Sequence, residues 1–271
     1  MIEFSSLKYT NDNDAYFIEC QQKGKIIIDG NSVNEPISIK IGDDCFVECL
    51  LLNDNEHLIS FDINNNAFLK LNVFTKNNAK DGKLVLNLFD NARLEVAYAD
   101  FSYGKKELNA VVNLNGNNAS VNWNLASLSQ NKDFKNYSVN FNHNTQNTYA
   151  NMVNYGVCKD QASLYFLGDA IINRGAIKSS TKQSAKILVF DETCHAKASP
   201  KLCIYENDVS ASHGASEGQI NKDHIFYLMS RGISEDEAKR LIIFGYLYPI
   251  ISFFDDESIK KDIEDCIVKR V

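Results

Sequence analysis

The sequence lacks several features that would assign it to a common functional class. It has no run of lysine and arginine, and its net charge of -7 argues against a surface that binds nucleic acid or anionic membranes. Prolines number only three and histidines five. No apolar stretch reaches membrane-spanning length, because Gly245 and Pro249 interrupt the longest candidate, residues 240–254. We therefore expect neither nucleic acid nor a membrane as a partner.

Motifs for nucleotide chemistry and for export are also missing. The sequence contains neither G-x-x-x-x-G-K-[ST] nor G-x-G-x-x-G, and it has no G-x-S-x-G nucleophile elbow. Residues 1–17 show no charged n-region and no apolar h-region, so we expect no signal peptide. The seven cysteines are odd in number and scattered, which favours reduced thiols and a cytoplasmic location. Cys45 and Cys49 form C-x3-C in an apolar run without a second ligand pair, so buried core thiols are favoured over a zinc site.

Short, alternating apolar segments follow one another from about Tyr16 to Tyr205. Their starts recur about every 9–12 residues, a spacing typical of all-β sandwiches, barrels or coiled β-solenoids. The connectors are rich in asparagine, aspartate and glycine, which tolerate the left-handed conformations of tight turns. Inward-pointing asparagine ladders would suit stacked parallel coils, and an AT-rich genome would explain the same abundance. Periodicity therefore predicts an all-β repeat without separating a solenoid from a sandwich.

The last quarter of the sequence predicts three helices. Asn221 is a suitable N-cap for a helix that stops at Gly232, and Ser234 opens a second helix with a capping-box spacing. A third helix is expected over residues 255–271, with acids at its start and bases at its end. Its apolar stripe is Ile259, Ile263, Ile267 and Val271. This stripe needs a surface to cover, either the β unit or a partner.

Four motifs near the C-terminal end give the sequence a family resemblance. They are P-x-L-x-I at Pro200–Ile204, D-V-x-x-x-H-G-A-[ST]-x-G at Asp208–Gly218, F-Y-L-x-S-R-G-I at Phe226–Ile233 and A-x-x-L-I-x-x-G at Ala238–Gly245. In this order and spacing they resemble the C-terminal signature of the SufB/SufD family of iron–sulfur cluster assembly proteins. The resemblance covers about residues 140–250, including the region around His143, and is weak before that.

The resemblance implies a fold and a set of partners. The fold is all-β with a helical tail: a right-handed parallel β-helix over residues 1–218, followed by a helical segment over residues 219–271. A SufD-like scaffold subunit of the SUF complex would pair with a SufB homologue, or with a second copy of itself. It would dock the SufC ATPase through its last helices, at Ala238, Leu241 and Gly245. ATP hydrolysis would belong to that partner, and this chain would be non-catalytic.

Two features place the sequence nearer SufD than SufB. Gly214 follows His213 where the SufB-like branch has glutamate, and residues 183–190 lack the cysteine that SufB-like proteins carry just before this apolar run. One position departs from the family, because SufD relatives often carry a cysteine where this chain has Ala211.

The resemblance also assigns a role to His213. By similarity this residue would lie at the SufB–SufD interface, where it would act with a SufB cysteine on a transient iron–sulfur cluster or on iron, as a tentative metal ligand. Cysteine is the main ligand of such clusters, and histidine substitutes in some. Cys194 precedes His213 by about one coil if coils contain roughly 20 residues, and stacking about 4.8 Å apart would make the two neighbours. A turn or core thiol is the alternative for Cys194.

Two other functions are compatible with a β-helix. One is a solenoid interaction module without cluster chemistry, which Ala211 keeps open. The other is a polysaccharide-acting enzyme, which would need a groove with paired carboxylates and usually an export signal.

Overall fold

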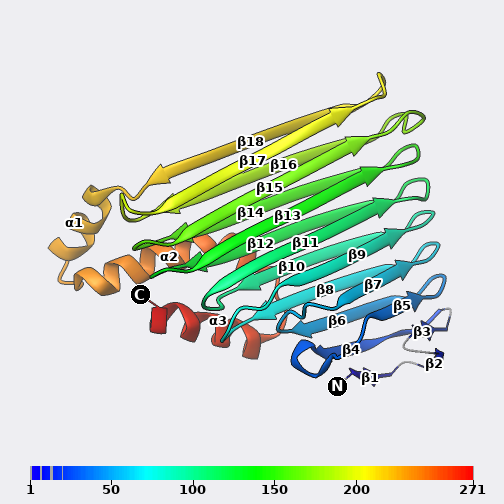
Figure 1. The fold of residues 1–271 in the computed structure, drawn as a ribbon, viewed down its shortest axis with the longest axis horizontal. Helices are drawn as coiled ribbons and strands as arrows, with labels where there is room; N and C mark the ends of the chain where they lie inside the picture. The colour runs from blue at the N-terminus through cyan, green and yellow to red at the C-terminus, as the bar shows by residue number, and fades with distance from the viewer. Residues whose placement is uncertain (1, 7, 13–14, 20, 271) are drawn as a thin grey trace.

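The chain folds as a parallel β-solenoid with helices on one side (Figure 1). The computed structural model describes residues 2–6, 8–12, 15–19 and 21–270. Within these residues the strands form two sheets of nine strands each. Sheet A runs in the order β1 (Ile2–Ser5), β4 (Lys23–Asp29), β6 (Phe46–Leu52), β8 (Phe68–Thr75), β10 (Arg93–Asp100), β12 (Ser120–Ser129), β14 (Tyr149–Cys158), β16 (Ser180–Val189) and β18 (Ser210–Gln219). Sheet B runs in the order β2 (Tyr9–Asp12), β3 (Ala15–Ile18), β5 (Ile37–Ile41), β7 (Leu58–Ile63), β9 (Gly82–Leu88), β11 (Lys105–Leu114), β13 (Phe134–His143), β15 (Ser163–Ile172) and β17 (His195–Ile204). The prediction of a parallel β-helix with a helical tail is confirmed.

The coils lengthen along the solenoid. In an early coil Phe46 pairs with Phe68, whereas in the last coil Ser163 pairs with His195, which is a longer step along the chain. Strands grow from four residues in β1 to ten in β11 and in every later strand. Strand starts therefore lie further apart than predicted over most of the C-terminal half, and the predicted coil length is too short there. Each coil contains two strands and two turns, and the turns add residues that strand periodicity does not report.

Asparagine and aspartate occupy the turns for the expected reason. They hold left-handed backbone at many coil corners, with φ of 58° at Asn66, 56° at Asn91 and 61° at Asn118. Asparagine ladders are also present, but not inside the solenoid. Asn113 donates to Asn87 and Asn142 donates to Asn113, each at 2.8 Å, on the half-buried outer face of sheet B. The expectation of inward-pointing ladders is therefore wrong, because alternation assigns the inner positions to apolar side chains.

The interior is a continuous apolar core between the two sheets. Strands alternate buried and half-buried positions, as in β13 and β15, and the largest buried side chain is Trp123. Cys45 and Cys49 are both buried in this core, and burial raises the pKa of the Cys49 thiol. Their expected role as core thiols is confirmed.

A buried network of charged groups interrupts the core near the corner that follows β10. The Asp100 carboxylate lies 3.0 Å from the Lys106 ammonium and 3.1 Å from that of Lys135, and all three side chains are fully buried. Asp54 pairs with Lys106 as well. Burial alone would raise the pKa of Asp100, but the two lysines and hydrogen bonds from Ser102 hold it well below its usual range.

Three helices follow the last strand, with the expected caps. Helix α1 (Lys222–Ser230) begins at Asn221, whose side chain accepts the N–H of Asp223 at 2.8 Å, and Gly232 beyond its end has φ of 87°. Helix α2 (Glu235–Ile251) begins at Ser234, and helix α3 (Glu257–Arg270) starts slightly later than predicted. None of the helices formed by the described residues is long and apolar enough to cross a membrane.

Helices α2 and α3 pack against the outer face of sheet A. The stripe Ile259, Ile263 and Ile267 is buried together with strand residues such as Phe74 and Leu128; Val271 lies outside the described residues. At the end of α3, Arg270 is also buried, donates to the carbonyl of Phe101 at 2.7 Å and pairs with Asp133. The stripe therefore covers the β unit, which decides between the two surfaces that its amphipathic pattern left open.

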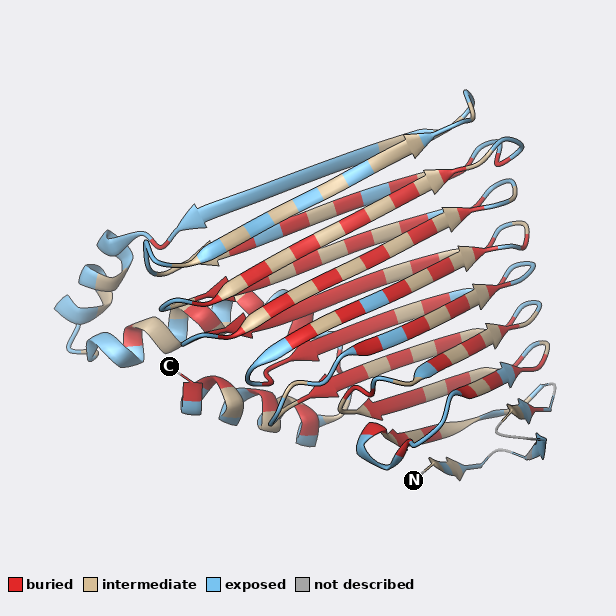
Figure 2. Ribbon diagram, viewed as in Figure 1, coloured by how far each residue is buried: buried red, intermediate tan, exposed pale blue. Residues whose placement is uncertain are grey.

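The two ends of the solenoid differ. At the N-terminal end, β1 pairs antiparallel with β4, and β2 pairs antiparallel with β3, so the chain folds back over its first coil. At the other end, β17 and β18 each pair with a single strand among the residues that the structure describes. Figure 2 shows the consequence, since β18 is exposed along almost its whole length. The last coil is therefore the open end of the solenoid.

Candidate functional site

His213 lies on the exposed strand β18 at the open end of the solenoid. The segment Ser210–Gln219 is a strand, not a turn, and His213 pairs in register with Gln183 of β16. The buried, inward-facing residues of β16 are Thr181, Gln183, Ala185 and Ile187. The β18 residues in register with them therefore share the inner face of sheet A. His213 is thus on the side facing the interior of the coil, but no further coil covers it.

The backbone of β18 is open to a partner on one edge. The N–H of Ser210 donates to the carbonyl of Ser179, the residue before β16, at 3.0 Å. The N–H of Ile220 donates to the carbonyl of Val189, the last residue of β16, at 2.9 Å. Because N–H groups alternate in direction along a strand, the even-numbered residues bond to β16. The odd-numbered residues, His213 among them, point their N–H and C=O groups away from the sheet. Such an edge is a ready template for another strand.

A buried glutamine lies directly beneath His213. Gln183 reaches across the interior to β15. With the amide oriented so that both of its polar atoms have a partner, it donates to the Gly168 carbonyl at 3.1 Å and accepts the Ala170 N–H at 3.0 Å. A Cβ at Gly168 would lie 3.0 Å from the Met152 sulfur and 3.3 Å from the end of the Gln183 amide. Glycine at this position therefore leaves room for the bridge. Our sequence reasoning gave Gln183 no role, although it occupies an inward position that is apolar in most strands.

A second polar group of the interior surrounds His143. Its Nδ1 lies 2.7 Å from the Thr148 hydroxyl, which is 2.7 Å from the Ser179 hydroxyl. Burial lowers the pKa of His143 to about 4, so this imidazole is neutral at neutral pH. His143 and His213 thus differ: His143 is enclosed, and His213 is accessible.

Cys194 does not lie beside His213. Cys194 comes just before β17, near the C-terminal end of β16. His213 is the fourth residue of β18 and pairs with Gln183 near the middle of β16. The extended strand that separates His213 from the end of β18 near Cys194 is roughly 20 Å long. Cys194 instead neighbours the buried Cys158: burial raises the pKa of Cys158, and Cys194 raises it further. The predicted proximity fails because the coils in this part of the solenoid are longer than the assumed period.

The residues predicted to dock a partner divide into two groups. Ala238 is fully buried and packs α2 onto the protein, whereas Leu241 is 49% exposed and Gly245 borders open space. Leu241 lines a groove between α2 and α3 together with Phe244 and Val268. The exposed side of α2 is therefore the part that a partner can reach.

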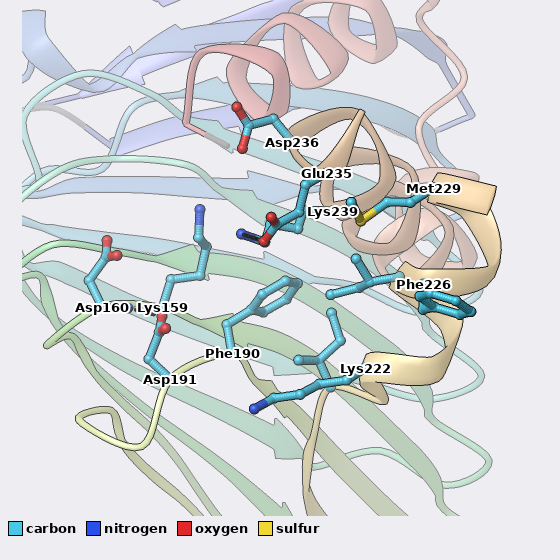
Figure 3. A pocket seen from close by; sticks show the side chains of 12 residues that line it. Lys159, Asp160, Phe190, Asp191, Lys222, Phe226, Met229, Glu235, Asp236 and Lys239 are labelled. Carbon is cyan, nitrogen blue, oxygen red and sulfur yellow. Dashed lines mark hydrogen bonds and ion pairs between the residues drawn. The ribbon is translucent and has the colours of Figure 1, made fainter. Parts of the chain in front are cut away.

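A second hollow, of about 490 Å³, lies between helices α1 and α2 and two coil turns (Figure 3). Phe190 and Ile220 contribute apolar surface, and Lys159, Asp191 and Lys239 are among the charged residues that line it. Helix α1 has no buried residue, and its Phe226 is 73% exposed. Exposed aromatic and methionine side chains beside a hollow are typical of a protein-docking surface. Our sequence reasoning missed this hollow, because its parts lie on four separate segments.

Among the residues that the structure describes, no three side chains of histidine, cysteine, aspartate or glutamate are grouped so that they could hold a metal ion. His213 would therefore supply one ligand at most.

Comparison with known proteins gives a consistent match. The family model described as "SUF system FeS cluster assembly, SufBD core domain" matches residues 53–246. The iron–sulfur cluster assembly protein SufD of Bacillus subtilis is 36% identical over 137 residues, which is 51% of this chain and 31% of the relative. SufD of Escherichia coli is 26% identical over 163 residues, covering 60% of this chain and 38% of the relative. The chain thus spans well under two-thirds of the length of these curated relatives.

Proposed function

Because the chain belongs to the SufBD core family, and its similarity is to SufD proteins, we propose that it is a SufD-like scaffold subunit for iron–sulfur cluster assembly. It acts in the cytoplasm, within the SUF system, and is not itself an enzyme. The cluster is a transient cargo built at a subunit interface. The observation that carries this proposal is the accessible His213 on the uncovered last strand of the solenoid. Family membership gives no support to a polysaccharide-acting enzyme.

The proposed partner at the open end is a SufB homologue. A strand edge with unbonded N–H and C=O groups binds another strand through main-chain hydrogen bonds. His213 provides an imidazole at this edge, and cluster ligands are mainly cysteine thiolates, so the remaining ligands come from the second subunit. The small side chains of Ala211, Gly214 and Ala215 allow a partner backbone to approach closely.

The proposed partner at the helices is the SufC ATPase. The sequence has no P-loop motif, so nucleotide hydrolysis comes from another subunit. Helices α1 and α2 offer exposed apolar residues, including Phe226, Tyr227 and Leu241. Phe226 lines the hollow of Figure 3, and Leu241 lines the groove between α2 and α3. Apolar anchors at the centre of a charged rim are the usual composition of a protein interface.

Anaerobic co-expression with the SufB and SufC homologues of the same organism tests this function. The mixed complex is isolated by size exclusion, and subunit stoichiometry, iron and sulfide are measured for the wild type, His213→Ala and His195→Ala. His195 is a matched control, because it is an exposed histidine on the other strand of the same coil. We expect all three complexes to assemble, and only His213→Ala to lose iron and sulfide.

Two results would contradict the proposal. Absence of any mixed complex would remove the scaffold role itself. An intact complex with equal iron in all three proteins would leave a solenoid interaction module without cluster chemistry, the alternative that Ala211 keeps open.

A further inference from the structure

Two cysteines meet at a corner of the solenoid where two successive coils are stacked. Cys158 is the last residue of β14 and is fully buried, and Cys194 immediately precedes β17 and is half-buried. The N–H of Phe190 donates to the carbonyl of Cys158 at 2.9 Å, and the N–H of His195 donates to the carbonyl of Ala162 at the same distance. The turn of residues 190–194 therefore lies directly on the turn of residues 159–162.

The two thiols are in contact across these turns. A hydrogen bond joins the side chains of Cys158 and Cys194. Each sulfur also reaches a carbonyl of the lower turn: Cys158 Sγ donates to Ala162 at 3.3 Å, and Cys194 Sγ donates to Asp160 at 3.7 Å. Both cysteines are free thiols in this structure. Two thiols that face each other from neighbouring coils are placed as the sulfurs of a disulfide must be.

The two thiols differ in how readily they react. Cys158 has no exposed surface, and burial raises the pKa of its thiol, so the reactive thiolate is disfavoured there. Solvent reaches part of Cys194. An accessible cysteine next to a second cysteine is the usual arrangement of a redox-sensitive site, in which the second thiol reacts with the oxidised first. Cys194 is suited to the first role and Cys158 to the second.

We infer that Cys158 and Cys194 form a redox-sensitive pair, which a peroxide converts to a disulfide and a thiol such as glutathione converts back. The Cys194 sulfur first attacks the peroxide, becomes a sulfenic acid and releases an alcohol, or water if the oxidant is hydrogen peroxide. The Cys158 sulfur then attacks the sulfenic sulfur, the S–S bond forms, and the hydroxyl leaves with the thiol proton as water. Two electrons thus pass from the thiols to the peroxide, and two glutathione thiols return them as they form their own disulfide.

The same two turns form one wall of the hollow in Figure 3. Lys159 and Asp160 of the lower turn and Phe190 and Asp191 of the upper turn line it. The Asp160 N–H donates to the Asp191 carboxylate at 2.6 Å, so the two turns are coupled at the hollow as well. A disulfide holds its sulfurs about 2.05 Å apart, much closer than hydrogen-bonded thiols, and its formation therefore displaces this wall.

The disulfide thereby acts as a switch on docking, a step that rests on the proposed function of the helices and the hollow. A protein interface depends on close shape complementarity at its centre. The oxidised chain, with its wall displaced, should therefore bind the SufC homologue less tightly than the reduced chain does.

Thiol counting on the chain alone tests the pair. The reduced chain is treated with hydrogen peroxide, unfolded and alkylated, and its mass and its cysteine-containing peptides are determined by mass spectrometry. The wild type should keep two fewer alkylated cysteines than its seven, yield a linked peptide with Cys158 and Cys194, and regain all seven after glutathione treatment. Cys203→Ser is the matched control, a half-buried cysteine of β17 outside the pair, and should form the same bond.

Single variants test the order of the two steps. In Cys158→Ser, the oxidised Cys194 has no partner and should remain a sulfenic acid, which dimedone traps. In Cys194→Ser, a half-buried and mild change, neither a disulfide nor a trapped sulfenic acid should form. Cys158→Ala and circular dichroism check that the buried substitution leaves the fold intact. A wild type that keeps all seven thiols, or that links either cysteine to a different one, would overturn the inference.

Binding in the two redox states tests the switch. The SufC homologue is titrated against the reduced chain, the oxidised chain and peroxide-treated Cys194→Ser. We expect the oxidised chain to bind about tenfold more weakly and the treated variant to bind as the reduced wild type does. By linkage, saturating SufC favours the dithiol and should raise the reduction potential of the pair by about 30 mV, the equivalent of tenfold for two electrons.

The outcomes distinguish the switch from the proposed function. Equal binding in both redox states would overturn the switch and keep the scaffold role. Failure to bind SufC in either state would contradict the docking role, whereas the disulfide itself is judged by the thiol count on the chain alone.

Discussion

The middle coils and the last coil of the solenoid share one backbone plan and differ in what lies above them. Strands β12 and β18 are equally long and belong to the same sheet. Strand β12 has a neighbour on each side and helix α2 across its outer face, and nearly all of it is buried. Strand β18 has one neighbour and is exposed. Burial in this fold is therefore decided by stacking, and the strand itself contributes little to the difference.

The comparison separates residues that maintain the fold from residues available to partners. In the middle coils, removing a polar side chain leaves another buried group without its partner, so the effect falls on stability. In the last coil, removing a polar side chain leaves no buried group without its partner. We therefore expect such a change to affect assembly with a partner and not the stability of the fold. The following predictions test this division, from the largest expected loss of stability to the smallest.

The largest loss is expected for Asp100→Ala in the buried charge network. This change leaves Lys106 and Lys135 without the carboxylate between them, in a site from which water is excluded. Breaking a buried pair by removing one partner costs about 3–5 kcal/mol. We expect the free energy of unfolding, measured by urea denaturation, to fall by this amount.

An exposed carboxylate on the last coils provides the matched control. Asp169 lies 3.9 Å from Lys201, and both side chains are largely accessible. A surface pair contributes about 0–1 kcal/mol, so Asp169→Ala should change the free energy of unfolding by no more than that. Equal losses for the two alanine variants would show that the middle and last coils do not differ as proposed.

The second prediction concerns how the buried His143 makes stability depend on pH. Its pKa is lowered to about 4 in the folded protein, from 6.5 for an ordinary histidine. Between pH 4 and 6.5, His143 binds a proton in the unfolded chain but not in the folded chain. Stability from this group is thus complete above pH 6.5 and is lost as the pH falls toward 4, by about 3 kcal/mol. Urea unfolding between pH 7 and 4 should show this slope in the wild type and a shallower one in His143→Gln; parallel curves would contradict it.

Much of the fold could be predicted from local sequence signals. Alternation in segments such as residues 134–143 identifies strands, asparagine identifies their corners, and Asn221 and Ser234 identify the starts of helices. Coil length could not be obtained in this way, because it depends on how two strands and two turns close around the core. The same limit explains Cys194, whose distance from His213 was inferred from an assumed period.

The candidate site was predictable only in part. The family resemblance selected His213, and the structure adds that it lies on an open edge above Gln183. The bridge from Gln183 to Gly168 depends on the register between two sheets, which no local pattern contains. The apolar stripe of α3 indicates that this helix packs against an apolar surface, and only the tertiary structure identifies sheet A as that surface. Relationships across coils are thus the part that sequence reasoning could not supply.

The smallest loss of stability is expected for His213→Ala. The imidazole is exposed, and among the described residues no hydrogen bond or ion pair of its side chain is found. Surface substitutions of this kind usually change the free energy of unfolding by less than about 0.5 kcal/mol. We therefore expect urea curves that coincide with the wild type, from the same preparation whose mixed complex loses iron.

This pairing of results separates a ligand from a structural residue. If His213→Ala lowers the free energy of unfolding well beyond that range, the imidazole supports the last coil, and any loss of iron would follow from a damaged edge. If stability is unchanged and iron is lost, the imidazole acts on the cargo directly. The second outcome is expected because β18, in contrast to β12, encloses nothing: a side chain that stabilises no core is available to bind at an interface.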